Sequence, residues 1–245
     1  MERVSLGILA TGLCVTLVSG CGGDKSAKAS PPPPAAVVTP SASVSASPPA
    51  RPSPTGPRPF AAKISKVTRA TVKHSWRPGC PVGLGGLRLI TMTYWGMDKK
   101  THEGAMVVNA DSAGKIVKVF RTLYGQRYPI RRMELVDKYG GSDFKSIEAD
   151  NTSAFNCRNA TGASSWSQHA YGHAVDLNTC ENPYVHPNGH IEHPRCVKYG
   201  NRKRHDPGLV HAGDKVVKAF RSIGWGWGGT WGGPWDYQHF SATGH

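Results

Sequence analysis

Two short segments hold the side chains with the clearest chemistry. Residues 167–176 read Ser-Gln-His-Ala-Tyr-Gly-His-Ala-Val-Asp, and residues 235–240 read Trp-Asp-Tyr-Gln-His-Phe. Imidazole nitrogens and a carboxylate oxygen are ligands that Zn²⁺ prefers, and a catalytic site keeps one further position open for water. His169, Asp176 and His239 would satisfy this set. We therefore predict that these three residues hold one zinc ion.

The chain must bend between His169 and Asp176 if both are to reach one ion. Their spacing of seven residues would put them on opposite faces of an uninterrupted strand, so the backbone has to turn at the Tyr171–Gly172 step. Beyond the bend, Asp176 lies on the strand face opposite to Val175, which points into the core.

Other histidines offer competing metal sites. His169 and His173 stand four residues apart, as in helical zinc motifs, but Gly172 weakens a helix and no Glu follows His169 as an H-E-x-x-H site requires. Five more histidines lie in a polar stretch with Pro and Gly, which favours a surface loop over a second metal site. They are His186, His190, His193, His205 and His211.

The two segments resemble a known family. The first matches the S-x-H-x-x-G-x-A-x-D signature of the M15 metallopeptidases, and the second matches their C-terminal acid-x-x-His motif. This family contains D-Ala-D-Ala carboxypeptidases and L-alanyl-D-glutamate endopeptidases, and the similarity runs from about Trp76 to Phe240. The resemblance implies a small α+β zinc domain of the kind shared with hedgehog-type proteins.

The resemblance also implies a role for each site residue. The three ligands named above would hold a single Zn²⁺, and Asp236 would be the general base on the attacking water. Arg158 would be the arginine that steadies a substrate carbonyl or carboxylate, and Ser167 would make a further substrate contact. The implied activity is zinc-dependent hydrolysis of peptide bonds in peptidoglycan stem peptides.

Two questions stay open at this point. Glu is the usual base in the dipeptidase and carboxypeptidase members, and Asp with His three residues later resembles the endopeptidase branch, so the bond that is cut is undecided. The alternative function is a non-catalytic, zinc-stabilised module that binds the cell wall, because a fold of this type can keep zinc without peptidase action. Asp236 discriminates between the two, since a pure binding module needs no base beside the metal.

The N-terminal residues predict export. The apolar stretch from Val4 to Val18 is too short for a stable membrane span and is typical of a signal peptide. It ends in Val-Ser-Gly-Cys, which resembles a bacterial lipobox. We expect residues 1–20 to be the leader and Cys21 to carry a lipid anchor on the outer face of the cytoplasmic membrane. An ordinary signal peptide without acylation is the alternative.

The next segment, residues 22–62, is rich in Pro, Ser and Ala and has few large apolar side chains, which predicts a disordered linker. Pro-rich linkers extend by ~3.1 Å per residue, so this segment would give the remaining chain a long reach from the membrane. We expect residues 63–245 to form a single zinc peptidase domain.

The net charge of the chain is +14. Five of the 30 basic and two of the 16 acidic residues precede Lys63, which leaves 25 basic and 14 acidic residues and a net charge of +11 from there on. A basic surface attracts polyanions, but no nucleic-acid recognition motif is present. We therefore expect no nucleic-acid partner and favour phosphate of the wall or membrane.

Four cysteines remain after Cys14 and Cys21, an even number in an exported chain, which predicts two disulfides. Three pairings are possible, and we favour Cys180 with Cys196 and Cys80 with Cys157. A zinc ribbon is the competing interpretation, but no C-x2-C spacing is present.

The apolar runs Leu87–Tyr94, Ala105–Val108 and Ile116–Phe120 predict strands, and the turn residues 111–114 predict a hairpin between the last two. An apolar stripe after Pro129 predicts a helix to Tyr139 that ends at Gly140.

A clearer helix begins after Asp214 and ends near Gly224. Its apolar face would hold Val216, Val217, Phe220 and Ile223. Together these elements predict an α+β domain with a central antiparallel sheet and flanking helices. Four tryptophans could line a cleft or pack in the core, and we favour the core for most, with Trp227 first. They are Trp225, Trp227, Trp231 and Trp235.

Overall fold

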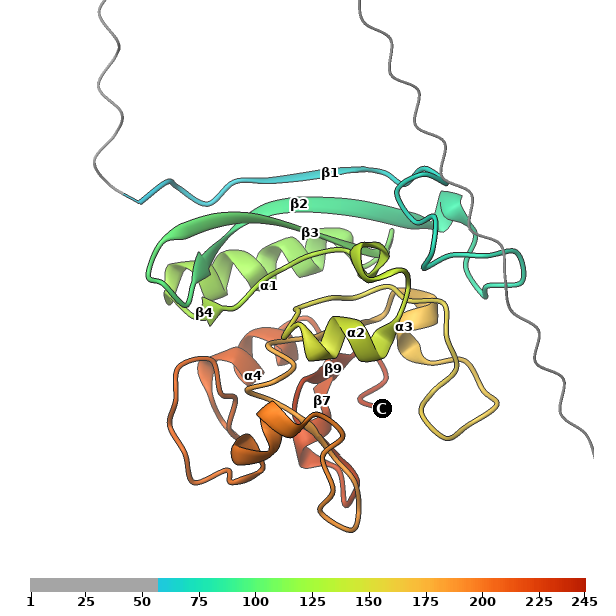
Figure 1. Ribbon diagram of the computed structural model, residues 1–245. Coiled ribbons are helices and arrows are strands. Elements are labelled where there is room, and N and C mark those ends of the chain that lie inside the picture. The colour runs from blue at the N-terminus through green and yellow to red at the C-terminus, as the bar shows by residue number, and fades with distance from the viewer. Residues whose placement is uncertain (1–56) are drawn as a thin grey trace, which may run out of the picture. The chain divides into compact units, whose positions relative to one another are not determined.

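The computed structural model describes residues 57–245 (Figure 1). The predicted leader, Cys21 and the Pro/Ser/Ala-rich segment up to residue 56 lie outside the described residues, so these predictions stay predictions. Within the described range, the helices are all too short or too polar to cross a membrane. The architecture is mixed α+β, with antiparallel sheets and several helices, as the sequence predicts.

The larger sheet is a meander of three antiparallel strands. They are β1 (Ala62–Lys66), β2 (Leu87–Gly96) and β3 (Thr101–Asn109). The short strand β4 (Pro129–Ile130) pairs in parallel with the end of β2. A 3-10 turn, η1 (Leu84–Gly86), leads into β2. Strands β2 and β3 confirm the first two predicted strands. The hairpin joins β2 to β3, whereas the sequence predicted it after the second strand.

The third predicted strand is wrong, because Ile116–Phe120 lies within helix α1 (Ala113–Gly125). Its buried residues recur every three or four positions, which forms one apolar face, and the lysines between them face solvent. A short β-branched run fits both periods, and only the longer window separates them. Residues 111–114, predicted as a hairpin turn, instead start this helix, with Ser112 at its N-cap position.

The predicted helix after Pro129 is mostly wrong as well. Only its last turn is helical, as η2 (Val136–Tyr139), and this turn ends at Gly140 as expected. The reason lies in the backbone of Met133, whose carbonyl accepts a hydrogen bond from Ala105 of β3. That pairing holds the segment extended against the sheet. Helix α2 (Asp143–Glu148) follows, with Ser142 as its N-cap.

Short elements build the second half of the described chain. A three-stranded antiparallel sheet has the order β5-β9-β7, and a separate pair joins β6 to β8. The strands are β5 (Ala174–Asp176), β6 (Tyr184–Val185), β7 (Gly226–Trp227), β8 (Trp235–Asp236) and β9 (His239–Ser241). The helical elements are α3 (Gln168–Tyr171), η3 (Pro194–Gly200), α4 (Lys215–Arg221) and η4 (Gly228–Thr230).

Helix α4 confirms the second predicted helix, with Asp214 at its N-cap position and Gly224 in the left-handed region at φ 84°. The Asp214 carboxylate does not cap α4, because its Oδ2 accepts from the backbone N–H of His211 instead. Burial of Val216, Val217 and Phe220 supplies the expected apolar face.

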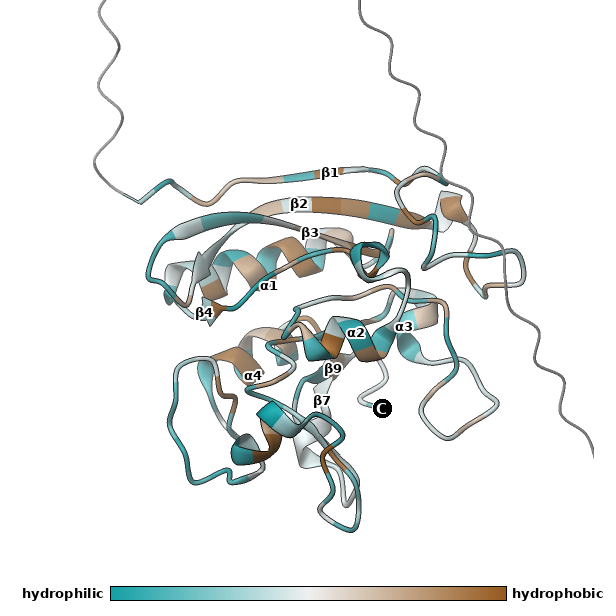
Figure 2. Ribbon diagram, in the orientation of Figure 1, coloured by the Kyte–Doolittle hydropathy of each residue, from teal (hydrophilic) through white to brown (hydrophobic). Residues whose placement is uncertain are grey.

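The main core lies between the larger sheet and the second half of the described chain. In Figure 1, α1 lies between the larger sheet and α4, and Figure 2 shows hydrophobic residues along β2, α1 and α4. The ring of Phe220 stacks on Phe240 of β9 with centroids 4.0 Å apart and meets Phe120 of α1 edge-on. Trp225 and Trp227 are buried in this core, as predicted. Burial of each such side chain contributes roughly 1.5–3 kcal/mol to the free energy of folding. The core therefore stabilises the positions of β5 and β9, which pack on it.

Two disulfides join distant parts of the described chain. Cys80 pairs with Cys157, 77 residues later, and Cys180 pairs with Cys196, 16 residues later. These are the two pairs favoured from the sequence.

Candidate metal centre

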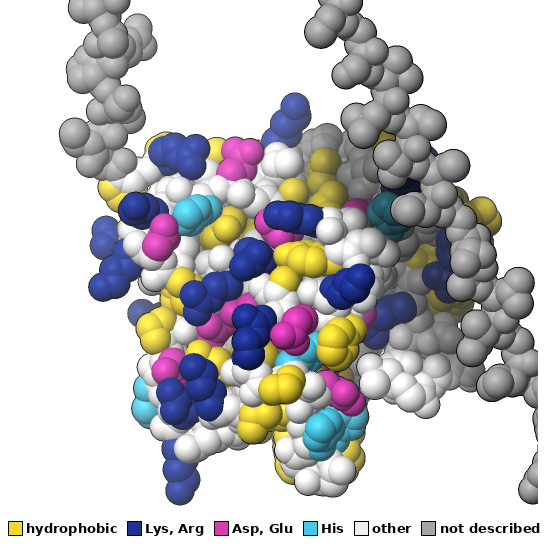
Figure 3. Space-filling view, viewed as in Figure 1, with side chains coloured by type: hydrophobic (Ala, Val, Ile, Leu, Met, Phe, Trp, Pro, Cys, Tyr) yellow, Lys and Arg dark blue, Asp and Glu magenta, His cyan; other side chains and the backbone are white. Residues whose placement is uncertain are grey.

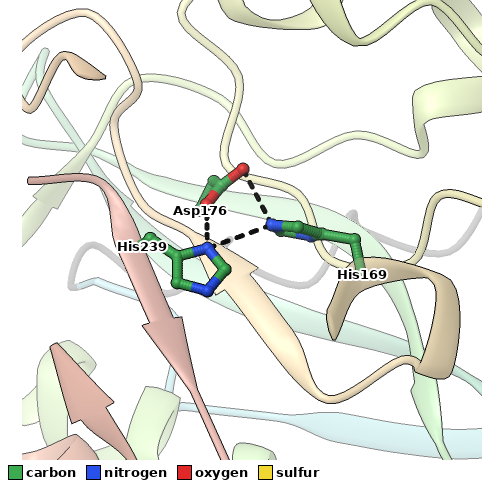
Figure 4. A group of neighbouring side chains, drawn as sticks. All are labelled: His169, Asp176 and His239. Atoms are coloured by element: carbon green, nitrogen blue, oxygen red, sulfur yellow. Dashed lines mark hydrogen bonds and ion pairs between the residues drawn. The ribbon is translucent and has the colours of Figure 1, made fainter. Parts of the chain in front are cut away.

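The side chains of His169, Asp176 and His239 converge on one point (Figure 4). His169 Nε2 lies 3.1 Å from Asp176 Oδ2 and 3.2 Å from His239 Nδ1, and His239 Nδ1 lies 3.2 Å from Asp176 Oδ1. All three residues are buried. The structure therefore brings together the three residues that were predicted from the sequence as metal ligands.

Strand pairing places two of the three ligands. Asp176 of β5 stands directly opposite His239 of β9 in the antiparallel register. Val175 and Leu177 point into the core on the other side of β5, which fixes the face that Asp176 presents.

A helical turn brings His169 to this face. Ser167 caps α3, because its Oγ accepts a hydrogen bond from the backbone N–H of His169. The helix ends at Gly172, which adopts φ 70°, and this is the bend that the ligand spacing requires. A Cβ at residue 172 would lie 2.5 Å from the backbone nitrogen of Asn109, so a side chain there would collide with β3. Gly172 therefore allows both the turn after α3 and the close contact of this turn with the larger sheet.

The hydrogen bonds of His169 show which ring nitrogen carries its proton. Nδ1 lies 2.5 Å from the carbonyl oxygen of Ala154, which can only accept, so Nδ1 is the donor. In the neutral ring, Nε2 then has a bare electron pair that faces Asp176 Oδ2, which is an acceptor too. This contact requires either a second proton on His169 or a metal cation among the three side chains. Two imidazoles and one carboxylate are a donor set that suits zinc, so the residues fit the ion.

The charges within the cluster are strongly coupled. Burial lowers the pKa of His169, but the charge of Asp176 and its hydrogen bond together outweigh this effect, so the pKa is raised overall. Burial in turn raises the pKa of Asp176, but its contacts with His169 and His239 outweigh burial and hold the pKa below its usual range. A proton at His169 Nε2 thus occupies the place that a metal cation would take.

Asp236 of β8 lies in the wall of the same cleft as His169 and His239. Its Oδ1 is buried and has no hydrogen-bond partner among the described residues. Burial raises its pKa to about 7, the charge of His239 opposes this rise and that of Asp176 adds to it. A carboxylate in this position can accept a proton from a molecule in the cleft.

Arg158 also lines the cleft, but its guanidinium has a partner within the protein. Its Nε lies 2.9 Å from Oδ1 of Asp143, at the start of α2, and its Nη1 donates to the carbonyl of Asn159. The ion pair orients the guanidinium at the cleft wall. Asp143 was missed as a site residue, since nothing in the sequence indicates that α2 lies beside residue 158.

The cleft has a volume of about 380 Å³ and includes Ser167 in its lining. The lining also includes Tyr184 of β6 and His245, which were not predicted as site residues, and Trp231, one of the four tryptophans that the sequence left between a cleft and the core. The ring of Trp231 lies 5.6 Å from that of His239, a contact that the Trp-Gly pattern could have indicated.

The histidines that offered competing metal sites in the sequence do not join this cluster. His173 pairs with Asp111 at 2.9 Å, and His193 pairs with Glu148 at 2.6 Å. Among the described residues, only the His169 cluster brings three or more possible ligands together.

Residues 161–242 match a family model described as D-alanyl-D-alanine carboxypeptidase, of the M15 peptidases. This segment is an M15 family domain. It contains all three candidate ligands and Asp236, whereas Arg158 lies just before it. The match covers about a third of the chain. No curated protein and no solved structure matches the chain.

Proposed function

We propose that this protein is a zinc-dependent peptidase that hydrolyses peptide bonds in peptidoglycan stem peptides. The observation that carries the proposal is the buried cluster of His169, Asp176 and His239, in which two hydrogen-bond acceptors, Nε2 of the neutral His169 ring and Oδ2 of Asp176, lie 3.1 Å apart. The M15 domain that contains these residues supports peptidase activity. We extend the proposal to the hedgehog-type zinc fold that the family resemblance implies.

The residues of the cleft would divide the chemistry among them. His169, Asp176 and His239 would hold the zinc ion, which supplies a Lewis acid that activates water and stabilises developing negative charge. Asp236 Oδ1 would accept the proton of the attacking water and return it to the leaving nitrogen. Arg158, oriented by Asp143, would steady a carbonyl or carboxylate oxygen of the substrate. Ser167 Oγ accepts from the N–H of His169 and still has its own proton to donate.

Asp236 favours this function over the non-catalytic wall-binding module. A carboxylate oxygen that is buried without a partner destabilises the protein, and a binding module gains nothing from it. In an enzyme, the same oxygen has a use as proton acceptor.

The disulfides and the N-terminal sequence support a location outside the cytoplasm. Two disulfides suit an extracytoplasmic environment. We propose that residues 1–20 are removed, that Cys21 carries a lipid anchor on the outer face of the cytoplasmic membrane, and that residues 22–62 link the anchor to a zinc peptidase domain of residues 63–245.

The proposal is tested by mass spectrometry of defined muropeptides after incubation with the zinc-loaded protein and with a chelator-treated control. Loss of a terminal D-Ala would identify a carboxypeptidase, and cleavage between L-Ala and D-Glu would identify an endopeptidase. If neither product forms in a metal-dependent manner from pentapeptide or cross-linked substrates, the proposal is wrong and the wall-binding module takes its place.

A further inference from the structure

A second cavity, of about 560 Å³, lies where the described chain begins. We call it the basic pocket. It shares no lining residue with the metal cleft, so the proposed chemistry does not use it. Four of its lining residues are exposed cations: Arg58, Lys99, Lys100 and Arg127. The others are Pro57, Trp95 and Thr101, so none of the described residues that line it is acidic.

The hairpin between β2 and β3 holds the two lysines of the basic pocket. The Gly96 N–H donates to the Lys100 carbonyl at 2.7 Å, and the Lys99 N–H donates to the Gly96 carbonyl at 3.0 Å. The acidic residue of this turn is Asp98, whose Oδ1 lies 2.8 Å from Nε2 of His102 and accepts from the backbone N–H of Lys100 at 3.1 Å. The carboxylate makes no ion pair with the ammonium group of Lys99 or Lys100, so both ammonium groups remain available at the pocket.

Aromatic side chains hold the two arginines. The guanidinium of Arg127 lies over the Trp95 ring, 5.2 Å from its centroid. The hydroxyl of Tyr124, near the end of α1, donates to the carbonyl of Arg58, and the Tyr124 ring packs against Trp95. The Arg58 guanidinium itself donates from Nη2 to the Thr101 carbonyl at 3.4 Å. Both arginines thus have defined positions, which lowers the entropic cost of binding an anion.

The charge and the place of this cavity indicate its ligand. Arginine and lysine together suit a phosphate group, through the planar fork of the one and the point charge of the other. The strand β1, the β2–β3 turn and the end of α1 meet at the left of Figure 1, and Figure 3 shows Lys and Arg side chains grouped along this edge. Pro57 lines the cavity, so the segment that leads back to Cys21 leaves the described chain at this point.

We propose that the basic pocket binds the phosphate of an acidic phospholipid headgroup. Lys and Arg clusters bind anionic membrane surfaces, and tryptophan favours the headgroup level. Binding here would hold this end of the protein against the membrane and keep the metal cleft, which has a separate lining, free for substrate. Phospholipid binding at this pocket does not depend on catalysis at the metal cleft.

The test is sedimentation with vesicles that contain phosphatidylglycerol, and with vesicles of phosphatidylcholine alone. The protein begins at Gly22, so that it lacks the predicted leader and Cys21 and keeps every described residue. We expect binding to the acidic vesicles only, with soluble glycerol phosphate as a competitor. The variant Lys99→Ala/Lys100→Ala/Arg127→Ala should bind about tenfold or more weakly.

A matched control removes the same charge elsewhere. The variant Lys198→Ala/Lys203→Ala/Lys215→Ala changes exposed lysines outside the basic pocket and should weaken binding by less than about threefold. Equal losses in the two variants would show a general charge effect and overturn the proposal. Binding to a phosphate-rich wall polymer but not to vesicles would overturn it too. If the pocket variant does not fold, the single change Lys100→Ala, at an exposed position, supplies the same comparison.

Discussion

At the scale of single residues, the metal centre depends on the orientation of one imidazole. The carbonyl of Ala154 takes the Nδ1 proton of His169 and leaves Nε2 as the electron pair that faces Asp176. A backbone acceptor of this kind is not visible in a sequence, because any residue type can supply it. The candidate ligands themselves could be picked out from the sequence, since their types and their spacing carry the signal without any knowledge of the fold.

Two substitutions separate metal binding from proton transfer. His169→Ala should abolish zinc retention and activity together, because it removes a ligand from the centre of the cluster. Asp236→Asn should retain zinc and lower kcat by about 10²–10⁴-fold, because the amide cannot accept a proton. Zinc content after dialysis and kcat for the muropeptide identified above check both expectations. Equal zinc loss in the two variants would contradict this division between a metal ligand and a general base.

At the scale of elements, the position of His169 relative to Asp176 depends on the turn at Gly172. Gly172→Ala should destabilise the protein by about 2 kcal/mol or more, because the residue has φ 70° and its Cβ would meet the backbone of Asn109 at 2.5 Å. Because the same change displaces α3 from β5, zinc affinity should fall as well. Chemical denaturation and zinc titration measure the two effects.

Gly114 of α1 offers the matched control. A Cβ there meets no atom within 4 Å, and the residue lies inside a helix, so Gly114→Ala should leave zinc affinity unchanged and stabilise by up to ~1 kcal/mol. A Gly172→Ala variant that is as stable as wild type and binds zinc equally well would show that the bend is not required.

The elements differ in how well the sequence predicts them. Strands β2 and β3 and helix α4 were predictable, because their apolar residues repeat with a clear period over the whole element. Ile116–Phe120 was misjudged because all but one of its residues are β-branched or aromatic and fit a strand, and the decisive signal lies in Ala113 and Leu123 outside that run. The segment after Pro129 failed for a different reason, since its pairing with β3 is a tertiary contact that overrides local preference.

Glu181 should make the free energy of unfolding depend on pH. Its carboxylate is buried beside Arg131 and interacts with Asp150, which follows α2. Burial, with the charge of Asp150, raises its pKa to about 7 in the folded protein, from about 4.5. Between these values the unfolded chain releases the proton first, so stability should fall as pH rises from about 4.5 to about 7, by up to ~3 kcal/mol.

The variant Glu181→Gln isolates the contribution of this carboxylate, because glutamine can still accept a hydrogen bond from Arg131 but cannot ionise. Urea denaturation at several pH values should show a flatter pH dependence for this variant than for wild type. Exposed Glu103→Gln removes the same charge from the surface and should keep the wild-type slope. A wild-type slope in Glu181→Gln would assign the pH dependence to other groups.

At the scale of the whole described chain, the larger sheet contributes to the basic pocket and the second half holds the candidate metal ligands. Cys80 precedes β2, and Cys157 precedes Arg158 in the cleft wall, so their disulfide ties the two halves together. The Cys180–Cys196 bridge acts more locally, because it closes the loop after β5. Both bridges restrict the unfolded chain, and the longer loop loses more entropy.

The two bridges should therefore differ in their effect on stability. Cys80→Ala/Cys157→Ala should lower the free energy of unfolding by about 4.5 kcal/mol, and Cys180→Ala/Cys196→Ala by about 3 kcal/mol, because the entropy lost by closing a loop grows with the logarithm of its length, here 77 and 16 residues. Urea denaturation of both variants under oxidising conditions measures the difference. Only the first variant should also loosen the cleft, because Cys157 adjoins Arg158, so KM should rise more in that variant. A larger loss from the shorter loop would mean that native contacts around Cys196, and not the entropy of the unfolded chain, determine what each bridge contributes.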